Sequence, residues 1–195
     1  MKVFIKLLIF LVFPVLLLIS GVVPVNQRLI VLLIMILGIV VMAIIERVPV
    51  QTLGFRVDNL KEAIIPYGVF TVLGVLFLVG LSFGLNKQPL PNWWTLIHLQ
   101  WLFLPISAFQ EFGYRAYFQT KLQKTVNPYL AIFIITILYS GMHILWKNPL
   151  VLAMSFFGGL GWGYLWYKHP NFYLISLSHS ILNFLAVYLG FFPKI

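Results

Sequence analysis

Seven polar residues with chemically useful side chains lie in long apolar stretches in the second half of this sequence. In chain order they are Gln110, Glu111, Arg115, Tyr139, His143, His179 and Asn183. Residues four apart on a helix share one face, so the last six form three helical pairs. A carboxylate or an imidazole can take a proton from water, and imidazole or amide N–H groups can stabilise an oxyanion. The set therefore suits hydrolysis of an amide bond by activated water.

Glu111 is the most informative member of the set. The other three acidic residues of the chain fall between positions 46 and 62. A charge at membrane depth is costly unless it is paired or lines a wet cavity, which makes Glu111 a candidate functional residue. A purely structural interpretation exists for each pair: a buried ion pair with Arg115, a packing role for His143, or hydrogen bonds between helices from His179. Three such pairs in succession favour function.

Metal binding is a competing interpretation of the same residues. Two histidines and a glutamate are a plausible zinc ligand set. The sequence lacks the H-E-x-x-H spacing of a helical zinc site, and it contains no cysteine. We therefore predict no cofactor and do not favour zinc.

The composition predicts an all-α, polytopic transmembrane bundle, because 62% of residues are hydrophobic and only 9% are charged. We expect the helices that carry the polar residues to surround a polar cavity within the membrane. About seven spans are predicted, at residues 7–24, 28–45, 64–85, 95–119, 129–146, 149–167 and 172–191.

The basic residues indicate the orientation of the chain. The formal net charge is +9, but the basic residues are scattered between apolar runs, which favours contacts with membrane lipids and argues against nucleic acid. With the N-terminus inside, the inner face holds Lys2, Lys6, Arg47, Arg56, Lys61, Lys121, Lys124 and Lys168. The outer face holds Arg28, Lys87, Lys147 and Lys194. We predict a cytoplasmic N-terminus in the plasma (inner) membrane.

A chain of this length supports a single integral-membrane domain, residues 1–195. We expect a core at about residues 95–190, preceded by two extra spans and an interfacial segment within 1–63. In that segment Asp58 is a candidate N-cap of a short amphipathic helix. Gly159 and Gly163 form a small-xxx-small pair that we interpret as a helix-packing site.

The three motifs resemble those of a known family, the CAAX-protease and bacteriocin-processing (CPBP, Abi) intramembrane proteases, which includes the type II CAAX prenyl endopeptidase. Its motifs read E-E-x-x-x-R, F-x-x-x-H and H-x-x-x-N or D. The matching segments here are 110–115, 139–143 and 179–183. The resemblance covers about residues 95–190, and residues 53–56 show a weaker similarity to the family.

The resemblance implies a role for each site residue. The family's first glutamate and the histidine of its second motif activate a water, which assigns water activation to His143 here. His179 and Asn183 would polarise the scissile carbonyl, and Glu111 and Arg115 would hold the site together.

Gln110 departs from the family pattern, because it stands where the family has its first glutamate. Glutamine has nearly the same shape but cannot accept a proton at neutral pH. Three explanations stay open: a natural pseudoprotease, a modified site in which Glu111 or His143 is the base, or an engineered inactivating substitution. Tyr139 replaces the family's Phe, a milder departure that should preserve packing.

The sequence thus supports an intramembrane endopeptidase that cleaves a peptide bond near the cytoplasmic face, acting on a peptide or a lipidated protein. The alternative is a catalytically inactive pseudoprotease that binds a peptide or a membrane partner. A small transporter is a third class, because ionisable residues in a bundle also mark proton pathways, but no inverted repeat supports it. The oligomeric state is left open.

Overall fold

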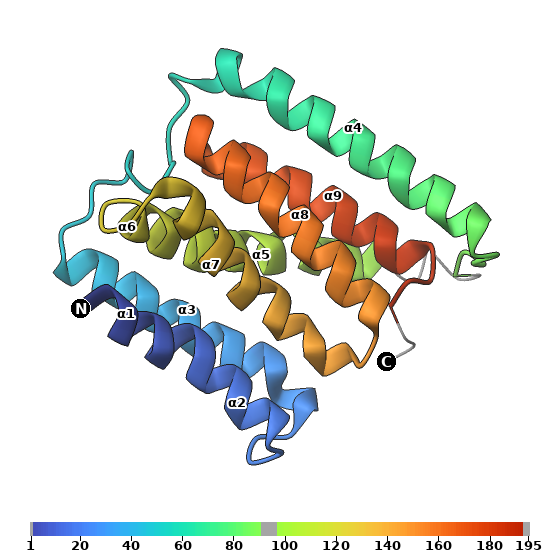
Figure 1. Ribbon diagram of the computed structural model, residues 1–195, viewed down its shortest axis with the longest axis horizontal. Helices are drawn as coiled ribbons and strands as arrows, with labels where there is room; N and C mark the ends of the chain where they lie inside the picture. Colours follow the sequence, from blue (N-terminus) through green and yellow to red (C-terminus); the bar gives the residue numbers. More distant parts are fainter. Residues whose placement is uncertain (1, 91–96, 193–195) are drawn as a thin grey trace.

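The computed structural model describes residues 2–90 and 97–192, which form helices joined by short connections (Figure 1). Some helices contain tight 3-10 turns or wide π turns, labelled η. The elements are α1 Lys2–Leu7, η1 Leu8–Val12, α2 Phe13–Ile19, η2 Val25–Gln27, α3 Arg28–Ile45, α4 Leu60–Gly84, α5 Ile97–Glu111, η3 Phe112–Gln119, α6 Thr120–Leu122, α7 Pro128–Met142, η4 His143–Trp146, α8 Pro149–Lys168 and α9 Phe172–Tyr188.

These elements combine into seven helical segments, in agreement with the seven predicted spans. Among the described residues, four helical segments are long and apolar enough to cross a membrane: 25–45, 60–84, 128–146 and 149–168. Two further apolar helices, 3–19 and 172–188, are shorter. The seventh segment, 97–122, carries the first polar motif. The predicted start of the fourth span at residue 95, and Lys194, lie outside the described residues.

Local sequence signals set the starts of three late helices. The side chain of Asn127 accepts a hydrogen bond from the first turn of α7, and Asn148 and Asn171 do the same for α8 and α9. Proline occupies the first position of α7 and α8, where its missing N–H costs nothing. These caps fix where the motif-bearing helices α7 and α9 begin.

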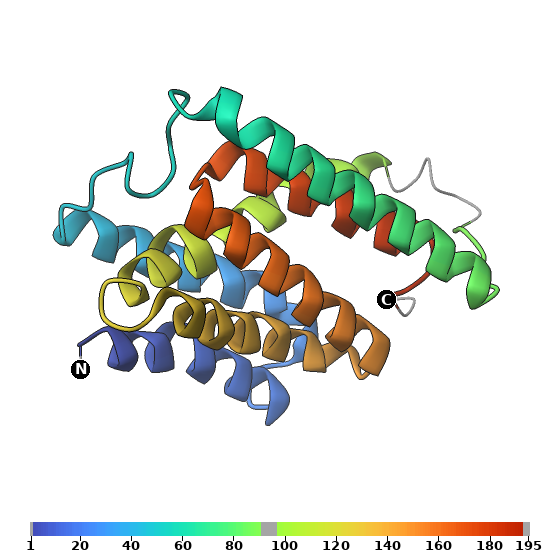
Figure 2. The ribbon, with the colours of Figure 1, turned by 45° about the horizontal axis from the view of Figure 1, so that its top comes forward.

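The helices that carry the motifs lie in the middle of the bundle. Figure 1 shows α4 along one edge and α1, α2 and α3 along the opposite edge, with α5, α7, α8 and α9 between them. The view in Figure 2 agrees with this arrangement. α5 packs mainly against α9, which also contacts α4, and α7 packs mainly against α8. The second half of the chain therefore forms the interior that the polar residues require.

The outer surface is apolar and the interior is partly polar, the reverse of a soluble domain. Large aliphatic side chains on α3 and α4 are well exposed, for example Ile34 at 65% and Leu76 at 62%. Glu111, Arg115 and Gln119 are fully buried. Apolar helices of this length with buried polar groups are typical of a membrane bundle, so the fold class is confirmed as an all-helical membrane protein.

The predicted N-cap at Asp58 differs by one residue from the observed helix start. Residues 49–59 form turns, and α4 runs without a break from Leu60 to Gly84. The N-cap position is Asn59, while Asp58 forms an ion pair with Arg56.

Glu46 anchors one end of the bundle, here called the basic end, which carries residues 46–59, 123–127 and 169–171. Its carboxylate pairs with both Lys6 and Lys121, and it accepts a hydrogen bond from the Tyr117 hydroxyl at 3.0 Å. Partial burial alone would raise the pKa of Glu46. The two ammonium groups and the hydroxyl outweigh burial and lower that pKa to about 2. One carboxylate thus joins α1, the end of α3 and α6.

Asn171 joins the same end from the opposite side. It is fully buried, and its amide donates to the carbonyl of Arg56 at 3.0 Å and to the side chain of Asn59 at 2.9 Å. The backbone N–H of Phe172 donates to the carbonyl of Gly54 at 2.9 Å. The loop after α3 is therefore fixed to the start of α9.

We expect the stability contributed by Glu46 to be lost in acid. Its pKa lies near 2 in the folded protein, below the usual 4.5, so its contribution is fully present above pH 4.5 and declines as the pH falls toward 2. Thermal unfolding in detergent, measured across this range, should show a flatter pH dependence for Glu46→Gln than for the unchanged protein. Identical profiles would contradict the ion-pair assignment.

Asn171→Ala should destabilise the protein by about 2–4 kcal/mol, because it removes a helix cap and leaves the Arg56 carbonyl and the Asn59 side chain without this donor. The matched control is Asn127→Ala, which removes the exposed cap of α7 and should cost only ~1 kcal/mol. Equilibrium unfolding in detergent micelles measures both values. Equal costs for the two variants would show that the loop contacts contribute nothing.

Candidate active site

The first motif lies where α5 changes into a π-helix. Glu111 is the last residue of α5, and η3 continues from Phe112 to Gln119 with every residue buried. π turns inside α-helices are often found at functional sites, because the wider turn redirects side chains. The turn of helix that holds Glu111 and Arg115 is therefore both interior and irregular.

Glu111 contacts one group on its own helix and one on α9. Its Oε1 accepts a hydrogen bond from Nδ1 of His179 at 2.7 Å. Its Oε2 lies 3.4 Å from Nε of Arg115, the predicted i,i+4 ion pair. A carboxylate can only accept, so His179 carries its proton on Nδ1. Two of the three predicted motifs thus meet at one carboxylate.

The other nitrogen of His179 contacts the second motif. The Tyr139 hydroxyl on α7 lies 3.0 Å from Nε2 of His179 and donates to it, because Nδ1 already holds the ring proton. Trp162 of α8 packs over the imidazole, with ring centroids 4.3 Å apart, and its indole N–H donates to Ser178. Both nitrogens and one face of His179 are therefore occupied by protein groups.

Arg115 is fully buried between α7 and α8. Its guanidinium lies over the Tyr139 ring, 4.3 Å from the centroid, and Nη2 donates to the carbonyl of Gly159 at 3.4 Å. A Cβ atom at Gly159 would lie 3.1 Å from Tyr139 and 3.4 Å from Arg115. Gly159 allows this approach, and the interpretation of the glycine pair as a close-packing site agrees with it.

Gln119 repeats the same contact one turn further along. Its amide donates to the carbonyl of Gly163 at 2.7 Å, and it is fully buried. Gly163 permits this, because a Cβ atom there would lie 2.9 Å from Ile132. Two side chains of η3, four residues apart, thus bind two glycines of α8 that are also four residues apart. This fixes the rotation of η3, and with it the direction of Glu111.

His143 begins the 3-10 turn η4 that follows α7. Its Nδ1 donates to the carbonyl of Tyr139 at 3.1 Å, and its ring lies edge-on to the Tyr139 ring with centroids 5.0 Å apart. With the proton on Nδ1, the lone pair of Nε2 can accept a proton from another group. His143 therefore has the tautomer that a base requires.

Gln110 and Asn183 are not joined to this network by hydrogen bonds among the described residues. Gln110 is 9% exposed, and its Oε1 has no hydrogen-bond partner in the described parts of the chain. Asn183 is half-buried on α9, one turn beyond His179. The two hollows at the basic end are lined by other residues. The predicted polar cavity around the motifs stays a prediction.

The arrangement can hold charge and orient an imidazole. Within residues 2–90 and 97–192, no three His, Asp or Glu side chains come together as a metal site would require. The elements of the network are one carboxylate, one guanidinium, one phenol and two imidazoles. Such a set can move a proton and stabilise an oxyanion.

Tyr139 is the residue whose role the sequence understated. Its ring packs against Arg115, as a Phe replacement should, but its hydroxyl also binds His179. The sequence could have predicted a hydrogen bond here, because a hydroxyl in a membrane span, one helical turn from His143, requires a hydrogen-bond partner. The contacts of Trp162 with His179 and Ser178 could not be predicted from the sequence, because neither Trp162 nor Ser178 belongs to a motif.

Residues 90–185 match the family model described as type II CAAX prenyl endopeptidase Rce1-like. All three motifs fall inside this segment. This segment of the chain is therefore similar to the Rce1-like family. No curated protein and no solved structure matches the chain. The Rce1-like segment contains α5 through α8 and most of α9, so the family match and the buried network cover the same part of the fold.

Glu111→Gln should destabilise the protein by ~3–5 kcal/mol, because it leaves the guanidinium of Arg115 buried without its counter-charge. Glu62→Gln is the matched control, since Glu62 is exposed and should change stability by about 0.5 kcal/mol or less. Equilibrium unfolding in micelles measures the difference. A near-neutral Glu111→Gln would show that the ion pair is not the main support of this site.

Proposed function

We propose that the chain is an intramembrane endopeptidase of the CAAX-protease type, which hydrolyses a peptide bond near the cytoplasmic face. The observation that carries this proposal is the buried contact of Glu111 with His179, made between two family motifs within the matched segment. The contact between Tyr139 and His179 adds the second motif. The substrate would be a peptide or a lipidated protein segment.

The reaction proceeds by direct attack of water. Nε2 of His143 takes a proton from water, and the water oxygen bonds to the scissile carbonyl carbon. The amide of Asn183 donates to the resulting oxyanion, and His179 can do so only once Nε2 carries a proton as well as Nδ1. The C–N bond then breaks, and the proton held by His143 passes to the leaving amine. Glu111 and Arg115 position His179 and touch no reacting atom.

Gln110 lowers the rate of this reaction. Its amide can hold a water by hydrogen bonds but cannot accept the proton that a glutamate would. The Tyr139 hydroxyl occupies Nε2 of His179 in the resting arrangement, and that nitrogen carries no proton. Substrate binding must turn the hydroxyl away, and Nε2 must gain a proton, before the imidazole can donate to an oxyanion. Slow turnover is the expected consequence of both features.

Gln110→Glu should raise peptide cleavage by ~10²–10⁴-fold, because it restores the proton acceptor that the family motif has at this position. The assay uses purified protein in liposomes and a fluorogenic peptide with a prenylated C-terminus, followed by mass spectrometry of the products. Gln88→Glu is the matched control, because Gln88 is exposed and lies outside the site. Equal gains from the two variants, or cleavage that survives His143→Ala in the Gln110→Glu protein, would contradict the proposal.

A second function is favoured by one specific observation: both nitrogens of His179 are engaged by Glu111 and Tyr139. On this basis the chain would be a pseudoprotease that binds a peptide or a membrane partner without cleaving it. The same assay separates the two functions, if peptide binding is also measured. Binding without cleavage by the unchanged protein, by Gln110→Glu and by Gln110→Glu with Tyr139→Phe supports the pseudoprotease.

A further inference from the structure

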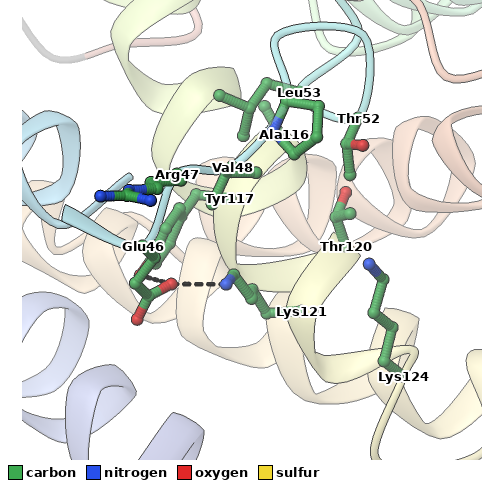
Figure 3. A pocket seen from close by; sticks show the side chains of 11 residues that line it. Glu46, Arg47, Val48, Thr52, Leu53, Ala116, Tyr117, Thr120, Lys121 and Lys124 are labelled. Carbon is green, nitrogen blue, oxygen red and sulfur yellow. Dashed lines mark hydrogen bonds and ion pairs between the residues drawn. The ribbon is translucent and has the colours of Figure 1, made fainter. Parts of the chain in front are cut away.

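A positively charged hollow opens at the basic end, away from the motif network (Figure 3). Its volume is about 220 Å³, and it lies between the turn after α3 and the end of η3 with α6. Ala116, Tyr117 and Leu53, all buried, form its floor. Its polar lining includes Thr52, Thr120, Lys121 and Lys124. The hollow has room for a small charged group.

The charge at this hollow is strongly unbalanced. Lys6 and Lys121 both pair with the single carboxylate of Glu46. Arg47 and Lys124 line the hollow as well, and among the described residues neither forms an ion pair with a carboxylate. Three cations and one anion therefore line the hollow, a formal excess of two positive charges. A group that carries negative charge is the ligand this lining favours.

One of these cations, Arg47, has an unfavourable backbone conformation. Arg47 has φ +51°, in the left-handed region that glycine normally occupies after a helix. The N–H of Arg47 donates to the carbonyl of Ile44 and the N–H of Val48 to that of Ala43, the hydrogen-bond pattern of a Schellman helix end. Glycine would satisfy the same geometry without strain.

The hollow also borders the lipid-facing surface. Ile44 and Ile45 precede Glu46 on α3 and are 70% and 73% exposed, and Val50 follows at 56%. Acyl chains of surrounding lipid would contact these aliphatic side chains. In Figure 3 Lys121 points to Glu46, while the amine of Lys124 lies beside Thr120. Basic pockets at the cytoplasmic ends of membrane helices bind phospholipid head groups in this way.

We propose that this hollow binds the phosphate of an anionic phospholipid from the surrounding membrane. Lys124 and Arg47 contact the phosphate, the hydroxyl of Thr52 donates to it, and the acyl chains lie along the aliphatic end of α3. The bound lipid would link the turn after α3 to α6, the elements that Glu46 already joins. This site is separate from the proposed peptide-cleaving residues.

The test measures lipid binding to the full chain in neutral detergent. Native mass spectrometry counts bound phosphatidylglycerol, with phosphatidylcholine as the neutral comparison and soluble glycerol 3-phosphate as competitor. The pocket variant combines Arg47→Gly with Lys124→Gln. The matched control combines Lys61→Gln with Lys168→Gln, two exposed cations of the same end that do not line the hollow. Both variants lose the same net charge.

The pocket variant should bind phosphatidylglycerol about 30-fold more weakly, at ~1 kcal/mol for each basic residue removed near the membrane surface. The control should stay within about threefold, because its cations lie outside the hollow. Arg47→Gly alone should unfold at the same or a higher temperature, since glycine relieves the left-handed conformation. Folding is thereby checked separately from binding.

Three results would overturn the proposal. Equal losses in the pocket and control variants would show diffuse attraction to the whole basic end. Displacement of the lipid by low concentrations of glycerol 3-phosphate would identify a soluble phosphate as the ligand. Equal binding of phosphatidylcholine would show that the negative charge is not recognised. None of these outcomes depends on peptide cleavage, so the proposed function is tested independently.

Discussion

A carboxylate buried in a membrane bundle must be neutralised, and the rest of this structure follows from how Glu111 achieves it. The residue is fully buried and has two charge or hydrogen-bond partners, Arg115 on the same helical segment and His179 on α9. Leaving a carboxylate unpaired in such surroundings would cost several kcal/mol. The helices that carry these partners are therefore held in one relative position.

The surrounding residues make those partners available. The π-helix η3 directs Arg115 and Gln119 toward α8, where Gly159 and Gly163 expose their carbonyl groups. Tyr139 contacts the guanidinium through its ring and the imidazole of His179 through its hydroxyl. The same few side chains thus pack the helices together, pair the buried charges and orient the imidazole of His179.

Much of the fold could be predicted from composition and hydropathy, and some of it could not. The predicted span 28–45 agrees with α3 at both ends, and the other spans deviate by a few residues. The i,i+4 spacing correctly predicted that Glu111 and Arg115 pair. The π turns of η3, the link from Asn171 to Arg56 and the triple contact of Glu46 depend on distant residues, which a periodic pattern does not encode.

The site could be predicted as a group of residues more readily than as a set of contacts. Motif spacing brought Glu111, His143 and His179 into one hypothesis, but it treated Tyr139 as a packing residue. In the structure this phenol is the link between the second and third motifs. The two departures from the family pattern, Tyr139 and Gln110, are best considered together, because the Tyr139 hydroxyl occupies Nε2 of His179 and the Gln110 side chain cannot accept a proton.

The central claim is that Glu111 and His179 interact directly in the folded membrane protein. A double-mutant cycle with Glu111→Gln, His179→Gln and the combined variant, measured by equilibrium unfolding in micelles, isolates that interaction. We expect a coupling free energy of about 1–3 kcal/mol, as found for contacting buried groups. Additive effects within ~0.3 kcal/mol would contradict the account, because they would show that the two side chains do not meet.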